Sequence, residues 1–470
     1  MTYHHAQRST GPRLHALLGD VAERLDGVAS RRVLGRVSRL VGLEVEARGV
    51  PGAIGDLMWL GEGRLPAEVI AIREDAVVLM PIGELEGIAA GDLVEAAGEP
   101  LRLTVGPGLV GRVLDGLGRP IDDLGPIQGQ TRRIDYAGSV PNPLKRQRIA
   151  DPLPLGVRVV DTMLTCGVGQ RVGIMAGSGV GKSTLLGMMA RGTEADVVVV
   201  GLVGERGREV REFLEDDLGP VGCARSVVVV ATSDEPPLLR LRAAFTATRI
   251  AELYADEGLN VLLLVDSLTR FAMAQRDVGL AAGEPPTTRG YPPSVFGMLP
   301  RLLERAGPRE RGSITGIYTV LVEGDDMNEP VADHARSILD GHIVLSRRLA
   351  AAGHYPTVDV LDSASRLAGK LLSADRLADV RSLRTLLAAW EEARDLVEIG
   401  AYRPGTNAHV DEYLAKRDSI DAFLRQNVDD IAEMGASWEE LRLLVGGPVP
   451  SPVPVPAAGP ISLGATGFTG

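Results

Sequence analysis

One glycine-rich stretch has the residue types and spacing needed to bind phosphate. Residues 176–183 read AGSGVGKS, between an apolar run (RVGIM) and a helical stretch (LLGMMAR). Glycines at this spacing let backbone N–H groups turn toward phosphate oxygens, and the next helix adds the positive end of its dipole. Lys182 supplies a charge for the β- and γ-phosphates, and Ser183 supplies a hydroxyl for Mg²⁺. The strict pattern begins with glycine where this chain has Ala176, and one methyl group does not change the chemistry of the loop. The predicted nucleotide-binding loop comprises Ala176, Gly177, Ser178, Gly179, Val180, Gly181, Lys182, Ser183 and Thr184.

Two acidic residues follow apolar runs that read as buried strands. Asp266 ends VLLLVD, and Glu205 follows DVVVVGLV within GLVGERGREV. The carboxyl ends of parallel strands meet at one sheet edge, where ligands bind. Asp266 is therefore a candidate second Mg²⁺ ligand, and Glu205 can polarise a water next to the γ-phosphate. The alternatives are a helix cap for Asp266 and an ion pair with Arg206 or Arg208 for Glu205.

The candidate site residues need a scaffold, and the sequence pattern of residues 171–347 indicates which scaffold it is. The short apolar runs RVGIM, DVVVVGLV, SVVVVAT, VLLLVD, SITGIYTVLV and HIVLS alternate with helical stretches. Near-continuous Val, Ile and Leu runs separated by helices are typical of a mainly parallel sheet that is covered on both faces. We therefore expect an α/β nucleotide domain over 101–372, in which GRVLDGLGRPID (111–122) forms strand, turn and strand.

The flanking regions have different patterns. Residues 12–41 place Leu and Val three and four residues apart, which predicts one amphipathic helix within the N-terminal segment 1–41. This helix either packs on its own domain or docks a regulatory partner. Residues 42–100 contain LEVEA, AEVIAI, AVVLMPI and DLVEA between glycine-rich turns, which predicts a small β-barrel. Residues 373–446 have helical spacing, and the Pro/Gly-rich tail 447–470 predicts disorder.

The composition excludes several classes of protein. The chain of 470 residues is 45% hydrophobic and 24% charged, which is ordinary for a globular protein. Its net charge of −12 argues against a surface that binds nucleic acid throughout. Two cysteines, Cys166 and Cys223, cannot form a disulfide framework and fit a reducing compartment. No signal pattern opens the chain, and its apolar runs are far below the ~20 residues that span a bilayer. We expect a soluble, cytoplasmic protein unless a partner recruits it to a membrane.

Five long motifs resemble one known family. They are AGSGVGKS, VGERGREV, ATSDEPPLLRLRAAFTATRIAE, LLLVDSLTRFAMAQRDVGLAAGEPPTTRGYPPSVFGMLPRLLERAG and VEGDDMNEPVADHARSILDGHIVLSR. They are similar to the flagellar protein-export ATPases and the type III secretion ATPases, which resemble the catalytic subunit of rotary ATP synthases. The resemblance covers roughly residues 35–445. It implies a β-barrel, a RecA-like P-loop domain and a helical C-terminal domain, assembled into a homohexameric ring that hydrolyses Mg²⁺-ATP.

The resemblance also assigns roles to individual residues. It implies that Glu205 is the catalytic carboxylate, that Lys182, Ser183 and Asp266 bind phosphate and Mg²⁺, and that Arg206 helps to organise the γ-phosphate side. Tyr355, in GHYPTVD, matches the aromatic residue that packs on adenine. Arg366, in DSASRL, matches the arginine finger offered to the neighbouring subunit. Without the resemblance, Tyr355 would read as a core or turn aromatic and Arg366 as a surface ion-pair residue.

The leading hypothesis is ATP hydrolysis that drives or primes protein export. A rotary proton-pump subunit is an alternative. A non-catalytic ring subunit is disfavoured by Glu205, and an RNA translocase is disfavoured by the net charge. The resemblance implies several partners: a negative regulator or stator at the N-terminal helix, a coiled-coil stalk in the ring pore, export-gate membrane proteins, export substrates and chaperones, but no nucleic acid. It places the ring at the inner-membrane export apparatus. DEPPLLRLR and SLTRFAMAQR favour flagellar over virulence-type export slightly.

Overall fold

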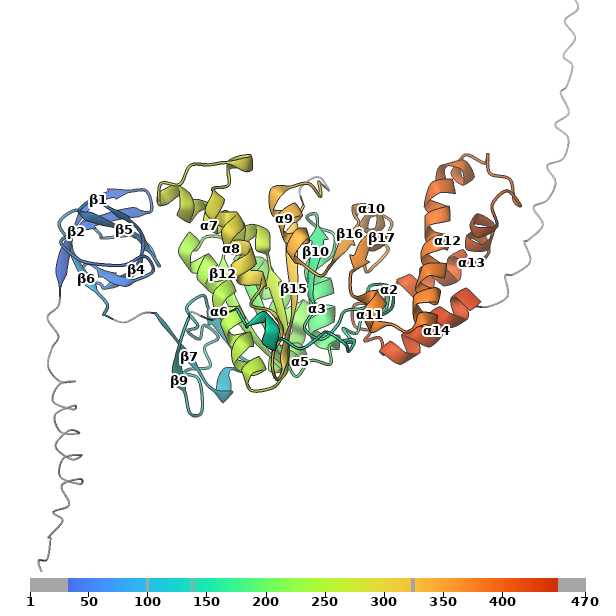
Figure 1. Ribbon diagram of the computed structural model, residues 1–470, viewed down its shortest axis with the longest axis horizontal. Coiled ribbons are helices and arrows are strands. Elements are labelled where there is room, and N and C mark those ends of the chain that lie inside the picture. Colours follow the sequence, from blue (N-terminus) through green and yellow to red (C-terminus); the bar gives the residue numbers. More distant parts are fainter. Residues whose placement is uncertain (1–32, 99–100, 137, 139, 323–325, 447–470) are drawn as a thin grey trace, which may run out of the picture.

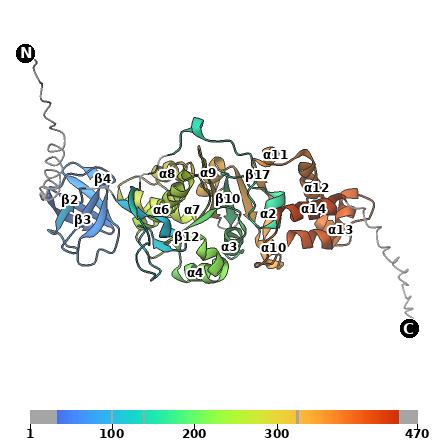
Figure 2. The ribbon, with the colours of Figure 1, turned by 90° about the horizontal axis from the view of Figure 1, so that it is seen from below.

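The computed structural model describes residues 33–98, 101–136, 138, 140–322 and 326–446. Figure 1 shows three parts in a row: a β-barrel, a central sheet with helices on both faces, and a helical domain. Figure 2 shows the barrel and the helical domain at opposite ends, with the central part between them. The predicted α/β fold, with its barrel and C-terminal helices, is confirmed.

The barrel consists of six strands that close in the order β1-β2-β5-β4-β3-β6. The strands are β1 (Leu34–Val41), β2 (Glu44–Arg48), β3 (Leu57–Leu60), β4 (Leu65–Arg73), β5 (Ala76–Pro81) and β6 (Leu93–Ala96). Alternate side chains such as Val45 and Ala47 point into a core of their own.

The start of the barrel corrects one prediction. Residues 34–41 form strand β1, so the helix predicted over 12–41 does not continue to residue 41, and the barrel begins before residue 42. The apolar residues Leu34, Val37 and Leu40 are three apart, which fits a helix as well as a strand. A register shift between Val37 and Arg39 breaks the two-residue period that would have marked a strand. The N-terminal part of the predicted helix and the tail 447–470 lie outside the described residues.

A short connection joins the barrel to the central sheet. Strands β7 (Arg102–Val105) and β9 (Arg132–Asp135) form an antiparallel pair. Between them, β8 (Val113–Asp115) adds to the edge of the central sheet beside β12. The turn after β8 returns as an isolated bridge between Leu114 and Pro120, so the predicted second strand of this turn is reduced to one bridge. The single turn η1 (Pro107–Leu109) lies between β7 and β8, and the single turn η2 (Pro143–Lys145) follows β9.

The central sheet runs in the order β17-β16-β10-β15-β13-β11-β12-β8. Its strands are β10 (Arg171–Ala176), β11 (Val197–Glu205), β12 (Ser226–Thr232), β13 (Asn260–Asp266), β15 (Ser313–Leu321), β16 (Gly341–Leu345) and β17 (Val358–Ser365), and the short β14 (Gly307–Pro308) pairs with β15. The strands from β16 to β8 are parallel, whereas β17 is antiparallel to β16. Parallel strands align their carboxyl ends, so the ends of β10, β11 and β13 share one edge.

Helices cover both faces of this sheet. Along β11, Val199 and Val203 belong to one buried cluster with α6 (Pro237–Asp256), α7 (Leu268–Ala281), α8 (Pro293–Leu303) and α9 (Pro330–Ile338). Val198 and Val200 belong to the cluster on the other face, with α2 (Arg158–Met163) and α3 (Lys182–Gly192). The segments α4 (Gly207–Glu212), η3 (Phe213–Leu218), α5 (Gly219–Ala224), η4 (Thr288–Gly290), α10 (Arg347–Ala351) and α11 (Ala368–Leu371) are short connections. This burial on both faces explains why the strands read as continuous apolar runs.

The C-terminal domain contains α12 (Ala374–Glu398), α13 (Ala408–Leu424) and α14 (Met434–Gly446). Ser373 and Asn407 cap α12 and α13 by accepting hydrogen bonds from backbone N–H groups of the first turn. Trp390 of α12 stacks on Tyr413 of α13, with ring centroids 5.0 Å apart. In the described part of the chain, no helix is both long enough and apolar enough to cross a membrane.

Candidate nucleotide site

The glycine-rich loop lies between the carboxyl end of β10 and the first residue of α3. Gly179 and Gly181 have φ angles of +74° and +85°, a backbone region that glycine adopts without strain. Ala176 is the last residue of β10 and is fully buried, which explains why its methyl group does not disturb the turn. Lys182 opens α3, so the loop presents backbone N–H groups at a helix N-terminus, as the motif predicts.

Three charged residues of the predicted site meet at the carboxyl edge of the sheet. The ammonium of Lys182 lies 2.5 Å from Asp266 Oδ1 and 3.4 Å from Glu205 Oε1. Glu205 ends β11 and Asp266 ends β13, the neighbouring strand. The carboxylate of Asp266 does not cap α7, because Ser267 occupies the N-cap and accepts the bond from the Arg270 N–H. The helix-cap alternative for Asp266 is therefore wrong.

Burial and neighbouring charges shift the acid–base behaviour of this group. Burial, followed by the charge of Asp266, raises the pKa of Glu205 to about 7, although Lys182 opposes this shift. Burial acts to lower the pKa of Lys182, but Asp266 and Glu205 outweigh it and raise that pKa above its ordinary value. Lys182 therefore stays cationic, while Glu205 titrates near neutral pH, where a general base is most effective.

Two residues of this site were missed by sequence reasoning. The hydroxyl of Thr319, in the buried strand β15, donates to Asp266 Oδ1 at 2.6 Å. The carboxyl of Glu209 is hydrogen-bonded to Glu205, and this bond is the main reason why the pKa of Glu209 is lowered. A polar residue inside an apolar run is the one signal that could have drawn attention to Thr319.

The structure also tests the alternative that Glu205 forms an ion pair with Arg206 or Arg208. Arg206 is exposed and pairs with Glu209 at 3.3 Å, while Arg208 pairs with Glu212 at 3.5 Å. The predicted alternative partners of Glu205 are thus occupied elsewhere, and its carboxylate faces Lys182 instead. Thr184 is placed in α3, where its hydroxyl bonds to Asp217, a contact that acts to lower the pKa of Asp217 against the larger effect of burial.

Tyr355 lies beside the glycine-rich loop although it is 174 residues away in sequence from Gly181. Its ring atoms are 3.6 and 3.7 Å from the point where a Cβ on Gly181 would stand. Tyr355 is 46% exposed, so part of the residue is open to solvent. An exposed aromatic ring next to a phosphate loop can stack on a nucleotide base.

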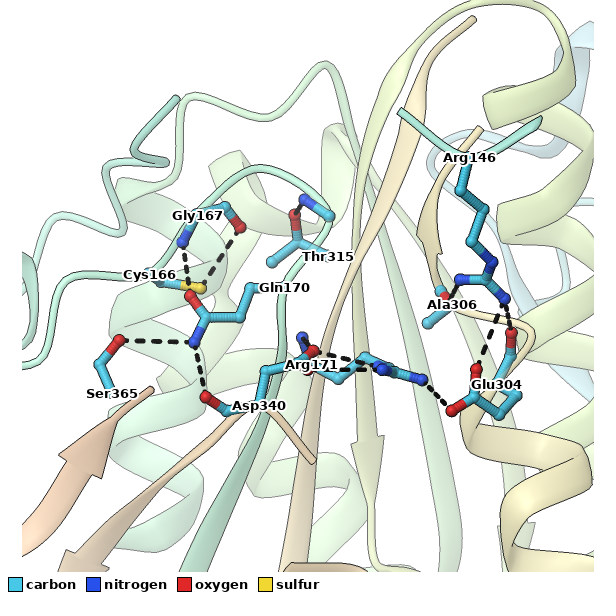
Figure 3. Close-up of polar contacts among 11 residues, drawn as sticks. Arg146, Cys166, Gly167, Gln170, Arg171, Glu304, Ala306, Thr315, Asp340 and Ser365 are labelled. Atoms are coloured by element: carbon cyan, nitrogen blue, oxygen red, sulfur yellow. Dashed lines mark hydrogen bonds and ion pairs between the residues drawn. The ribbon is translucent and has the colours of Figure 1, made fainter. Parts of the chain in front are cut away.

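Arg366 lies at the opposite edge of the sheet. It follows β17, and its backbone N–H donates to the carbonyl of Asp340, which precedes β16. The N–H of Asp340 in turn donates to the carbonyl of Arg171, the first residue of β10. Figure 3 shows this edge, where Arg171 bridges the carboxylates of Asp340 and Glu304. The backbone of Arg366 is therefore level with the first residue of β10. Because a strand rises ~3.3 Å per residue, Arg366 lies about 17 Å, measured along the strands, from the end of β10, where the glycine-rich loop of the same chain begins.

The donor set at the carboxyl edge fits Mg²⁺. Asp266 already holds one cation, the Lys182 ammonium, and Ser183 places a hydroxyl in the first turn of α3. In the described residues no group of three or more His, Cys, Asp or Glu side chains forms a metal cage. Mg²⁺ needs no such cage, because it usually keeps several waters and is bound through one or two carboxylates and the substrate phosphates.

Comparisons with known proteins agree with this architecture. Residues 156–365 match the nucleotide-binding domain of the ATP synthase alpha/beta family, and residues 372–443 match the T3SS EscN ATPase C-terminal domain. The flagellum-specific ATP synthase of Bacillus subtilis (strain 168) is 51% identical over 417 residues, covering 88% of this chain and 95% of that protein. The type 3 secretion system ATPase of Xanthomonas euvesicatoria is 50% identical over 421 residues, with the same coverage.

A solved structure extends the agreement to three dimensions. The assembled ATPase EscN from the type III secretion system of enteropathogenic E. coli superposes with a TM-score of 0.84 at 45% identity. The superposition covers 87% of this chain and all of that one. A second structure holds EscN in complex with its central stalk EscO, with a TM-score of 0.82. Similarity at this level, over nearly the full length of each relative, shows that the chain belongs to the family of flagellum-specific ATP synthases and type 3 secretion system ATPases.

Proposed function

We propose that this protein is an ATPase that hydrolyses Mg²⁺-ATP to energise protein export. The observation that carries the proposal is the Lys182 ammonium between the carboxylates of Glu205 and Asp266, at the mouth of a glycine-rich loop. A cation in that position meets the β- and γ-phosphates of a nucleotide bound by the loop. The names of the relatives, ATP synthase and ATPase, support a nucleotide as the substrate.

Each residue then has a role in the reaction. The loop from Ala176 to Thr184 binds the phosphates through backbone N–H groups. Ser183 and Asp266 would hold Mg²⁺, which supplies charge neutralisation on the phosphate oxygens. Glu205 accepts a proton from the attacking water. Because its pKa is raised to about 7, the protonated carboxyl that this transfer creates is accessible near neutral pH. Thr319 orients the carboxylate of Asp266, because its hydroxyl occupies one lone pair of Oδ1.

Two more residues complete the nucleotide site in this proposal. Tyr355 packs on adenine, and its ring beside Gly181 and its partial exposure support this role. Arg206 helps to organise the γ-phosphate side from the N-cap position of α4. Arg366 acts on the site of a neighbouring subunit, because the opposite sheet edge places it too far from its own loop. The assembled relative EscN supports a ring, for which we propose six identical copies.

The export role rests on the relatives. Flagellum-specific and type 3 secretion proteins both match at about 50% identity, which favours export over a rotary proton-translocating ATPase. We propose a stalk protein as a partner in the ring, by analogy with EscN and EscO. The apolar spacing of the N-terminal segment supports docking of a regulatory or stator protein there. We further propose that the ring works at the cytoplasmic side of the membrane export apparatus, where it meets gate proteins, substrates and chaperones.

Two linked measurements test the proposal. The purified full-length chain should release phosphate from ATP when Mg²⁺ is present and lose this activity when EDTA removes the metal. Lys182→Ala should lose it under both conditions. In the source bacterium, deletion of the gene should abolish secretion of flagellar or type III substrates, and the parent chain but not Lys182→Ala should restore secretion. Normal secretion by a strain that carries only Lys182→Ala would contradict the proposal.

A further inference from the structure

One side-chain hydrogen bond joins the loop that carries Tyr355 to the glycine-rich loop at residues 176–184, called the phosphate loop below. The hydroxyl of Thr357 donates to the carbonyl of Val180 at 2.6 Å. Thr357 is 2% exposed and Val180 is 1% exposed, so water cannot take the place of this bond. Tyr355 stands two residues earlier, with its ring against Gly181. The bond therefore joins the residue proposed to hold the base to the loop proposed to hold the phosphates.

On its other side, the same loop is attached to the helical domain through Gln426, just after α13. The backbone N–H of Gln426 donates to the carbonyl of Tyr355 at 3.0 Å. Its side-chain amide accepts from the N–H of Arg158 and donates to the carbonyl of Gly156, each at 2.8 Å. Gln426 is itself buried, and these bonds link the Tyr355 loop to the helical domain and to the start of α2. If the Thr357 bond were lost, Gln426 would still hold Tyr355 to these two elements, but not to the phosphate loop.

The two loops differ in how much else holds them. The phosphate loop continues from β10, which is paired on both sides by β15 and β16, and leads into α3, an 11-residue helix. The Tyr355 loop joins α10, which has only five residues, to β17, an edge strand of the sheet. Backbone bonds from Ser346 to Thr357 and from Gln426 to Tyr355 also hold it, but neither bond reaches the phosphate loop. Loss of the bond between them should therefore displace Tyr355 and leave the phosphate loop in place.

We propose that Thr357 is a positioning residue that holds Tyr355 against the phosphate loop and thereby sets the affinity of the site for the base of the nucleotide. This inference rests on the proposed role of Tyr355 in the ATPase site. Thr357 touches no substrate atom in this account. It acts through the position of the aromatic ring, so its contribution depends on a base being present in the ligand.

The test compares two ligands that differ in the base. Equilibrium binding of ATP and of inorganic tripolyphosphate, which has phosphates but no base, is measured with Mg²⁺ on full-length chains that also carry Glu205→Gln, so that bound ATP is not hydrolysed. Thr357→Val should weaken ATP binding about tenfold, the size expected for a lost buried hydrogen bond. Binding of tripolyphosphate should stay within about twofold, because the loop itself is unchanged. In chains that keep Glu205, KM for ATP should rise with kcat unchanged, the pattern of lost uniform binding. Thr357→Ser, which keeps the hydroxyl, should restore ATP binding.

Three further variants make the result decisive. Thr246→Val is the matched control, because its buried hydroxyl donates to the carbonyl of Gly116 at 2.7 Å, outside both loops; it should bind both ligands like the parent. Tyr355→Ala should lose ATP affinity, and adding Thr357→Val to it should cost little more, because both act through the same ring.

The outcomes separate the two claims. If Tyr355→Ala binds ATP like the parent, the proposed base site is wrong, and the role of Thr357 falls with it. If Tyr355→Ala weakens binding but Thr357→Val does not, the base site stands and the positioning role is overturned. Equal losses for ATP and tripolyphosphate in Thr357→Val would also overturn it, because they would mean that Thr357 supports the phosphate loop instead.

Discussion

Lys182 and Glu205 lie 3.4 Å apart, but the proposed mechanism assigns them to different states of the reaction. In that proposal Lys182 contacts the phosphates of bound ATP, whereas Glu205 orients the attacking water and matters mainly in the transition state. Glu205→Gln keeps the size and the hydrogen bonding of the side chain and removes the base. It should bind ATP nearly as the parent does and lose on the order of 10²-fold or more in kcat. Nucleotide affinity and steady-state turnover check this, and turnover within about threefold of the parent would contradict the role of Glu205.

The raised pKa of Glu205 also predicts how activity depends on pH. As the proposed general base, Glu205 must be ionised, and burial together with the charge of Asp266 raises its pKa to about 7. Activity should therefore be low at pH 6 and rise as pH passes through about 7, since kcat/KM reports the groups of the free enzyme. A profile of kcat/KM between about pH 5.5 and pH 9, a range that brackets the pKa of Glu205, measures this dependence. A profile that is flat across this range would mean that Glu205 is not the base.

At the scale of residues, the sequence predicted the side chains that follow a recognisable element. Lys182, Glu205 and Asp266 each stand at the end of a strand or at the start of a helix, and parallel strands bring such ends together. Thr319 and Thr357 were not predicted, because their importance comes from contacts between elements that are distant in sequence. No local pattern indicates which buried hydroxyl faces which carboxylate or carbonyl.

The connection around β8 contains a buried ion pair between Arg112 and Asp122. Arg112 binds Asp122 through two hydrogen bonds of 2.7 Å, and both side chains are largely buried. This contact with Arg112 lowers the pKa of Asp122 to about 2, and bonds from Val113 and Leu124 add to the effect. A carboxyl with a depressed pKa stabilises the fold above the unfolded value, ~3.9, and this stabilisation is lost as pH falls toward about 2.

A substitution at Asp122 tests this contribution. Asp122→Asn should lower the free energy of unfolding at pH 6 by on the order of 1–2 kcal/mol, allowing for partial solvent screening. The difference from the parent should shrink between about pH 4 and pH 2, because the parent loses the same interaction there. Denaturant unfolding across this pH range measures both effects. A difference that is constant with pH would show that the ion pair does not titrate as described.

At the scale of elements, the apolar runs predicted the central strands well, because burial on both faces removes the ambiguity of spacing. β12, for example, spans Ser226–Thr232, the same residues as the predicted SVVVVAT run. The error at β1 arose where spacing alone had to decide between a helix and a strand, and a bulge obscured the strand period. β3 was missed because LMWL is only four residues long, and three of its four residues are buried, without the alternation of a half-exposed strand.

At the scale of the whole molecule, the two edges of the central sheet carry the two halves of the proposed site. The carboxyl edge holds Lys182, Glu205 and Asp266, and the opposite edge holds Arg366. Head-to-tail contacts between identical subunits generate a ring when the rotation closes, and such contacts place different surfaces against each other. The position of Arg366 at the opposite edge could not be predicted from spacing or composition, because it depends on β17 running antiparallel to β16. Only the family resemblance indicated it.

Mixed rings test this central claim most directly, because they separate the two halves of the site. An arginine finger contributes ~10³–10⁵ in rate, so Arg366→Ala should fold and assemble but hydrolyse almost no ATP. Lys182→Ala should be equally inactive. In rings that contain both variants, the intact Arg366 of a Lys182→Ala subunit can act on the intact phosphate loop of a neighbouring Arg366→Ala subunit. Phosphate release should therefore recover in part, with a maximum at intermediate ratios. Fluorescence transfer between labelled subunits confirms that the rings have mixed. Confirmed mixed rings that remain as inactive as both parents at every ratio would contradict a site shared between subunits.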